Sequence, residues 1–191
     1  MSVVGIMGGT FDPIHYGHLI TAQAVKEIRN LDKIILIPCY ISPHKTNENN
    51  LDSHHRLKMI ELAISDLKGF EVNDYELKKG GISYTIDTLR RLKKSRDQLE
   101  LIIGFDNLVK FDTWKNPDEI LGLANLVVMR RKIDIIPKKK NKYFDSAILV
   151  DTPSIEINAT QIRKRVKDDL MIDFLVPKKV KEYIYDLKLY K

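Results

Sequence analysis

Two histidines three residues apart, His15 and His18, follow a glycine-rich stretch near the beginning of the chain. Residues 8–18 read GGTFDPIHYGH. Glycines let the backbone turn tightly and approach a ligand, and Asp12 followed by Pro13 marks a turn before a helical pattern begins. Because the free N–H groups and the dipole at a helix start favour phosphate, this segment predicts a phosphate-binding turn.

The two imidazoles admit three interpretations: metal ligands, buried core residues, or hydrogen-bond donors to a phosphate that gains charge during transfer. A metal site lacks a third ligand nearby in the sequence, and the glycine-rich context differs from that of a zinc-binding helix. A lone histidine usually belongs to a core, but a pair beside such a turn does not fit that pattern. We favour phosphate donors, with Gly17 between the histidines leaving room for a nucleotide.

Apolar runs typical of strands alternate with helical patterns along the chain. We predict strands at residues 3–7, 33–37, 70–72, 99–104, 125–129 and 147–150. We predict helices at residues 16–30, 54–67, 84–94, 159–166 and 177–187, with Pro177 at the first position of the last helix. The apolar face of the second helix is predicted to comprise Leu57, Ile60, Ile64 and Leu67. This alternation predicts an α/β, Rossmann-like fold, a doubly wound parallel sheet with ligands beyond the carboxyl ends of its strands.

The length of 191 residues suits a single domain, residues 1–191, whose helical C-terminal part covers about residues 159–191. The apolar runs are too short to cross a bilayer, and the N-terminus reads as a strand and not as a signal peptide. Because Cys39 is the only cysteine, we expect no internal disulfide and a cytoplasmic location. The net charge of +6 favours anionic ligands, and the lysine-rich residues 138–142 are interpreted as a solvated loop.

Residues 9–18 resemble the HxGH signature of the nucleotidyltransferase superfamily. The resemblance to the bacterial nicotinate-nucleotide adenylyltransferase family extends along almost the whole chain, and its supporting segments are residues 43–45, 82–89, 103–106, 111–115 and 159–163. Residues 83–85 and Trp114 narrow the resemblance to this family. The late motif of the family usually reads Ile-Ser-Ser-Thr-x-Ile-Arg, whereas Asn158 and Ala159 precede Thr160 in this chain.

The resemblance implies an HxGH nucleotidyltransferase fold with a short C-terminal helical segment. It implies an enzyme that transfers AMP from ATP to nicotinate mononucleotide, giving nicotinate adenine dinucleotide and pyrophosphate in NAD biosynthesis. Mg²⁺ is expected to accompany ATP, with no permanently protein-bound metal. The expected partners are ATP and nicotinate mononucleotide, without nucleic acid or membrane, and the oligomeric state stays open between a monomer and a homo-oligomer.

Carried over residue by residue, the resemblance implies three groups of site residues. The catalytic residues are His15, His18 and Arg163. The residues that bind ATP and its phosphates are Gly8, Gly9, Thr10, Phe11, Gly17, Lys45, Gly104, Asp106, Thr160 and Arg163. The residues that bind nicotinate mononucleotide are Ser83, Tyr84, Thr85 and Trp114.

Several of these residues have a structural alternative when the family is set aside. Arg163 and Lys45 are equally well read as surface side chains. Asp106 follows a strand, where a carboxylate can bind ribose hydroxyls, but it also suits the N-cap of a short helix. Residues 83–85 suit an N-cap, and Trp114 suits a core or surface-covering aromatic.

Two other functions compete with this reading. A phosphopantetheine adenylyltransferase would share the first motif, but residues 83–85 and Trp114 disfavour it. A basic nucleic-acid-binding protein would interleave basic and aromatic side chains on one face. This chain instead places glycine, histidine and threonine at a predicted strand–helix junction, which favours catalysis on a nucleotide.

Overall fold

The structure is a computed structural model that describes residues 2–43, 50–93, 97–131, 134–135 and 140–191. Within these ranges, a six-stranded parallel sheet has the order β3-β2-β1-β4-β5-β6. Its strands are β1 (Val3–Gly9), β2 (Lys33–Pro38), β3 (Phe70–Val72), β4 (Gln98–Gly104), β5 (Asn125–Arg130) and β6 (Ala147–Asp151). The strand order runs outwards from β1 to β3 and then restarts at β4, beside β1. This switch point confirms the predicted doubly wound sheet.

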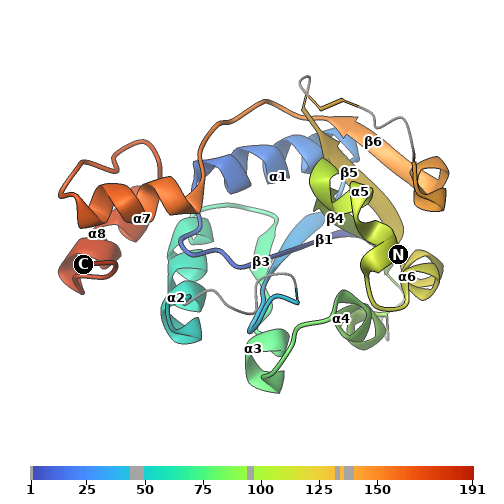
Figure 1. Cartoon of the computed structure of the whole chain (residues 1–191), viewed down its shortest axis with the longest axis horizontal. Coiled ribbons are helices and arrows are strands. Elements are labelled where there is room, and N and C mark those ends of the chain that lie inside the picture. The colour runs from blue at the N-terminus through green and yellow to red at the C-terminus, as the bar shows by residue number, and fades with distance from the viewer. Residues whose placement is uncertain (1, 44–49, 94–96, 132–133, 136–139) are drawn as a thin grey trace.

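Helices cover both faces of the sheet (Figure 1). The α-helices are α1 (Tyr16–Ile28), α2 (Ser53–Ile64), α3 (Tyr75–Lys79), α4 (Thr85–Leu92), α5 (Phe105–Val109), α6 (Pro117–Leu123), α7 (Ala159–Lys167) and α8 (Lys178–Asp186), and the 3₁₀ helices are η1 (Phe111–Thr113) and η2 (Lys142–Ser146). One core packs α1, α2, α7 and α8 against the sheet, and the other packs α4, α5 and α6. In the described part of the chain, no helix is long and apolar enough to cross a membrane.

The predicted strands and the five longer helices are all present, with shifted ends. The three shortest helices, α3, α5 and α6, have five to seven residues and were not predicted as elements. A helix of fewer than two full turns carries too little apolar periodicity to be recognised in a sequence. The last helix begins one residue later than predicted, since Pro177 is its N-cap and Lys178 its first residue.

The described part of the lysine-rich run is a loop at residues 140–141 and begins the 3₁₀ helix η2 at Lys142. Residues 138 and 139 lie outside the described residues. Lys142 begins η2, and its ammonium lies 2.8 Å from a carboxylate oxygen of Asp118 on α6. The side chain of Lys142 is nevertheless 68% exposed, so the described lysines of the run face solvent.

The buried face of α2 differs from the predicted apolar stripe. Ile60 and Ile64 are buried as expected, but Leu67 lies beyond the end of the helix and is 40% exposed. The fully buried positions include Met59 and Arg56, and the Arg56 side chain is only 2% exposed. An apolar pattern cannot predict this face, because one of its members is charged.

The guanidinium of Arg56 compensates for its burial with hydrogen bonds to main-chain oxygens. It donates to the carbonyl oxygens of Thr10 and Cys39 at 2.8 Å each, of Leu51 at 3.0 Å and of Tyr40 at 3.4 Å. These carbonyls belong to the turn after β1, the segment after β2 and the segment before α2. A single side chain thus joins three loops that meet at the carboxyl edge of the sheet.

We predict that Arg56→Met lowers the free energy of unfolding by about 3 kcal/mol, because several buried carbonyl groups lose their hydrogen-bond donors. Chemical denaturation measures this change. Lys58→Met on the same helix is the matched control, since Lys58 is exposed and pairs only weakly with Glu61 at 3.5 Å. The control should stay within about 0.5 kcal/mol of the parent chain. Equal effects of the two substitutions would contradict this role of Arg56.

Candidate active site

A cavity of about 460 Å³ opens at the carboxyl end of β1 and brings together residues from both ends of the chain. Seven predicted site residues line it, namely Thr10, Phe11, His15, Gly17, His18, Thr160 and Arg163. We call this space the histidine cavity. Its residues come from the turn after β1, the start of α1 and the start of α7, so the fold joins segments about 150 positions apart. The position at the switch point is the one predicted for a ligand.

The two histidines form a stacked pair at the beginning of α1. His15 is the N-cap residue, and its ring centroid lies 3.7 Å from that of His18. A side chain at Gly17 would place its Cβ within 2.9 Å of the His15 ring. Gly17 therefore leaves room for the imidazole of His15. The sequence analysis assigned this space to a nucleotide and did not predict the contact with His15.

Burial keeps both imidazoles neutral. It lowers the pKa of His15 to about 4, and burial together with the neighbouring His15 lowers the pKa of His18 to about 3. The main-chain N–H of His15 donates to Nδ1 of His18 at 3.3 Å. In a neutral His18 this bond places the ring proton on Nε2. His18 can therefore act as a hydrogen-bond donor through Nε2 without taking up a proton.

The backbone ahead of the histidines is held in an unusual conformation. Phe11 has a φ of 50°, in the left-handed region, and its ring meets the His18 ring edge-on with 5.0 Å between centroids. A Cβ at Gly9 would come within 2.8 Å of the Phe11 ring. Since few residues adopt this conformation without support, Gly9 and Phe11 act together to shape the turn.

Asp12 is the centre of the hydrogen bonds that hold this turn, although the sequence did not single it out as a site residue. Arg163 donates to its carbonyl oxygen at 2.7 Å, and the Tyr190 hydroxyl donates to its carboxylate at 2.6 Å. The N–H of Leu51 donates to the second carboxylate oxygen at 3.1 Å. Burial, and then the neighbouring Asp12, raise the pKa of Tyr190. Asp12 is itself only 3% exposed, so these bonds are well shielded from water.

Arg163 is therefore not a free surface side chain. Besides Asp12, its guanidinium contacts the Thr160 hydroxyl at 3.3 Å, one turn earlier on α7. The N-cap of α7 is Asn158, whose side-chain oxygen accepts from the N–H of Gln161 at 2.9 Å. Asparagine and serine are both strong N-cap residues. The departure from the family motif at position 158 thus keeps a side chain that can begin this helix.

A second cavity, of about 410 Å³, lies beside the first and contains all four residues predicted for the acceptor together with three glycines predicted for ATP. Its predicted members are Gly8, Gly9, Gly104, Ser83, Tyr84, Thr85 and Trp114. We call it the tryptophan cavity. Both cavities are lined by Met7, Thr10 and Met129, so they meet at the end of β1. A molecule in one cavity can therefore contact a molecule in the other beside Thr10.

Ser83 is held by protein partners and is not an N-cap. Its hydroxyl oxygen accepts from the N–H of Tyr40 at 2.9 Å and donates to the carboxylate of Glu76. The N-cap of α4 is Tyr84, without a side-chain capping bond. Glu76 is a buried residue that also accepts from the Thr88 hydroxyl, and burial raises its pKa. The sequence missed Glu76 because it stands in a short helix with no motif of its own.

Trp114 is half-buried at the opposite side of the tryptophan cavity. Its ring packs against buried Phe111 with 5.1 Å between centroids. Trp114 thus packs against the core and also lines the cavity. Its position fits both a core aromatic and an acceptor-binding residue.

One predicted residue, Asp106, stands apart from these cavities. The Asp106 side chain is 90% exposed, lies 3.8 Å from Arg131 and is not among the residues that line either cavity. It is the second residue of α5, whose N-cap is Gly104, so the N-cap alternative for Asp106 is wrong. Lys45 lies outside the described residues.

Comparison with known proteins identifies the family of this chain. Residues 6–165 match the family described as cytidylyltransferase-like. Two relatives named "probable nicotinate-nucleotide adenylyltransferase" are each 41% identical: one from Clostridium botulinum, over 100% of this chain and 99% of its own length, and one from Thermoanaerobacter sp., over 98% and 94%.

Among solved structures, the Plasmodium falciparum nicotinic acid mononucleotide adenylyltransferase complexed with NaAD superposes with a TM-score of 0.79. The superposition covers 100% of this chain and 98% of that one, at 18% identity. At that identity it shows a shared fold, and the two relatives above supply the sequence match. The chain belongs to the nicotinate-nucleotide adenylyltransferases of the cytidylyltransferase-like family.

Proposed function

We propose that this chain transfers the AMP part of ATP to nicotinate mononucleotide, giving nicotinate adenine dinucleotide and pyrophosphate in NAD biosynthesis. The observation that carries the proposal is the meeting of two cavities beside Thr10. The histidine cavity offers donors for the phosphates of ATP, and the tryptophan cavity offers an aromatic ring for the acceptor. Release of pyrophosphate from ATP that requires nicotinate mononucleotide is the direct test.

The reaction needs alignment and charge stabilisation more than proton transfer. An oxygen of the acceptor phosphate, already an anion, attacks the α-phosphorus of ATP. A new P–O bond forms while the bond to the bridging oxygen of the β-phosphate breaks, and pyrophosphate leaves with that electron pair. Charge builds on the oxygens around the α-phosphorus. We assign His18 Nε2–H, His15 and Arg163 as the donors that stabilise this charge.

We expect Mg²⁺ to be the metal that accompanies ATP, where it would neutralise charge on the β- and γ-phosphates. In the described residues, no three His, Cys, Asp or Glu side chains lie close enough together to hold a metal ion. The carboxylate of Asp12, beside the histidine cavity, is occupied by Tyr190 and Leu51. Phosphate oxygens and water would therefore supply most of the ligands of this ion.

Replacing His18 with alanine should lower kcat about 10² to 10³-fold while changing the KM for ATP much less, because the donor matters most as charge develops in the transition state. Steady-state kinetics give both values. The control is His54→Ala, which removes an exposed imidazole from α2 that lines neither cavity. The assignment is wrong if His18→Ala turns over within a few-fold of the parent enzyme.

The histidine pair should stay neutral in acid where ordinary histidines do not. At pH 5.5 an unperturbed imidazole is mostly protonated, but the lowered pKa values of His15 and His18 keep both uncharged. Because the unfolded chain then binds more protons than the folded one, stability falls as the pH drops from 6.5 towards 4. Side-chain ¹⁵N chemical shifts of the substrate-free protein measure the state directly. Imidazolium signals from both residues at pH 5.5 would refute the proposed state.

The beginning of α4 should determine the preference between nicotinate mononucleotide and nicotinamide mononucleotide. The first N–H groups of a helix lack intrahelical partners and suit an anion. Nicotinate mononucleotide carries a carboxylate there, whereas the amide of nicotinamide mononucleotide turns N–H donors towards other donors. We predict a preference for the carboxylate of at least about 10² in kcat/KM, since sites built for one polar group reject its analogue strongly. Comparable efficiency with both acceptors would eliminate this explanation.

Two substitutions at Thr85 separate the contributions to this preference. Thr85 is the first residue of α4, a position where proline preserves the helix but removes the N–H. Thr85→Pro should erode the preference, and Thr85→Val, which loses only the hydroxyl, should erode it less. Trp114→Ala should raise the KM of both acceptors alike, because stacking on the pyridine ring does not distinguish carboxylate from amide.

A further inference from the structure

The tryptophan cavity has two walls that come from separate parts of the chain. One wall is the beginning of α4, with Tyr84 and Thr85, and the other is the segment that carries Trp114 and Lys115 between η1 and α6. The distance between these walls determines whether a flat ring fits between them. The contacts that fix this distance therefore bear on how the acceptor binds.

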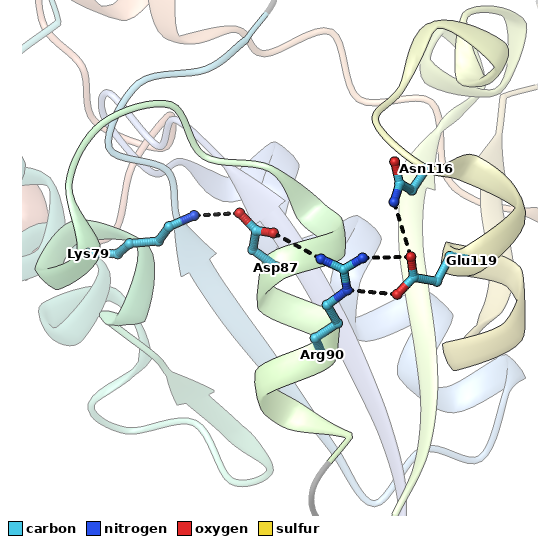
Figure 2. Close-up of polar contacts among 5 residues, drawn as sticks. All are labelled: Lys79, Asp87, Arg90, Asn116 and Glu119. Atoms are coloured by element: carbon cyan, nitrogen blue, oxygen red, sulfur yellow. Dashed lines mark hydrogen bonds and ion pairs between the residues drawn. The ribbon is translucent and has the colours of Figure 1, made fainter.

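A continuous chain of polar contacts crosses from α3 through α4 to α6 (Figure 2). Lys79 pairs with Asp87, and Asp87 lies 3.6 Å from Arg90. Arg90 then forms a two-pronged pair with Glu119, with its Nε and Nη2 at 2.6 and 2.7 Å from the carboxylate oxygens. Parallel bonds of this kind fix orientation as well as distance.

The last member of the chain, Asn116, connects it to the tryptophan wall. Its side-chain amide donates to Glu119 at 3.1 Å. Asn116 has a φ of 53°, in the left-handed region, and is the N-cap of α6 two residues after Trp114. The carboxylate that holds this strained turn is thus the same one that binds Arg90 on α4. The course of the backbone beside Trp114 is tied to the opposite wall.

A second contact joins the walls nearer to the cavity. The ammonium of Lys115 lies over the ring of Tyr84, 4.2 Å from its centroid. The same part of α4 also has a carboxylate in its first turn, Asp87, which by itself would repel an anion at the helix start. Lys79 and, more weakly, Lys115 and Arg90 lower the pKa of Asp87. The polar chain therefore offsets a charge that would oppose an anionic acceptor.

We propose that Arg90 and Glu119 are positioning residues that hold Trp114 at a set distance from the beginning of α4. Neither side chain is among the residues that line the tryptophan cavity, so both act through the backbone of α4 and of residue 116. The consequence for the acceptor rests on the function proposed above. The position of the Trp114 indole does not depend on that function, and it can be measured without any substrate.

The experiment compares Glu119→Gln with Asp118→Asn. Both remove one acidic charge from the first turn of α6, and both break an ion pair, but Asp118 pairs with Lys142 and not with α4. Trp114 is the only tryptophan of the chain, so its fluorescence reports this wall alone. Glu119→Gln should raise the acrylamide quenching constant of Trp114 about two-fold and the KM for nicotinate mononucleotide about five-fold, the scale of a partly exposed ionic network. The kcat and the KM for ATP should stay within about two-fold, and Asp118→Asn should leave all four values unchanged.

A second variant, Arg90→Met, should reproduce both changes, and the double variant should be no worse than either single one, because all three break the same contact. Identical quenching and KM values for Glu119→Gln and Asp118→Asn would overturn the proposal, as would additive effects in the double variant. A shift in quenching without a shift in the acceptor KM would uphold the positioning of Trp114 and overturn its consequence for the acceptor. A parent enzyme that turns over no nicotinate mononucleotide refutes the proposed function, and the quenching comparison then decides the positioning of Trp114 alone.

Discussion

Hydrogen bonds from three distant side chains fix the turn after β1, and both cavities depend on that turn. Arg56 of α2 binds the carbonyl of Thr10, Arg163 of α7 binds the carbonyl of Asp12, and Tyr190 binds the Asp12 carboxylate. With the turn held in this way, Phe11 keeps its left-handed backbone and the histidine pair stacks at the start of α1. The side chains that we propose to be catalytic are therefore positioned mainly by the backbone of this turn.

Two kinds of hydrogen-bond donor surround the turn, charged guanidinium groups and neutral imidazoles. The guanidinium groups of Arg56 and Arg163 donate to main-chain carbonyls of the turn. The imidazoles of His15 and His18 remain neutral because they are buried against each other. A neutral donor stabilises a developing charge without a competing proton equilibrium. These neutral donors support the proposed role in electrostatic stabilisation rather than in acid–base catalysis.

Sequence patterns predicted the sheet and the phosphate-binding turn, because both follow local rules, whereas Ser83, Thr85 and Trp114 were predicted only through the family resemblance. Apolar runs give strands, and glycine, histidine and threonine stand where the first strand ends. The patterns did not predict the partners of the turn. Arg56 interrupts the apolar stripe of α2, and Tyr190 is one aromatic among eight tyrosines, so their importance comes only from contacts across the fold. The N-cap alternative for Asp106 was wrong for a different reason, since the helix begins at Phe105 and its N-cap is Gly104.

The contact between Asp12 and Tyr190 joins positions 178 residues apart. During synthesis, the glycine-rich turn is made early, directly after β1. Tyr190, whose hydroxyl binds Asp12, is made only after all six strands of the sheet. The nascent chain can therefore build most of its hydrophobic core around a turn that still lacks one of its supports. A chain that stops before residue 190 would therefore lack the hydroxyl that binds the Asp12 carboxylate, although it contains all six strands of the sheet.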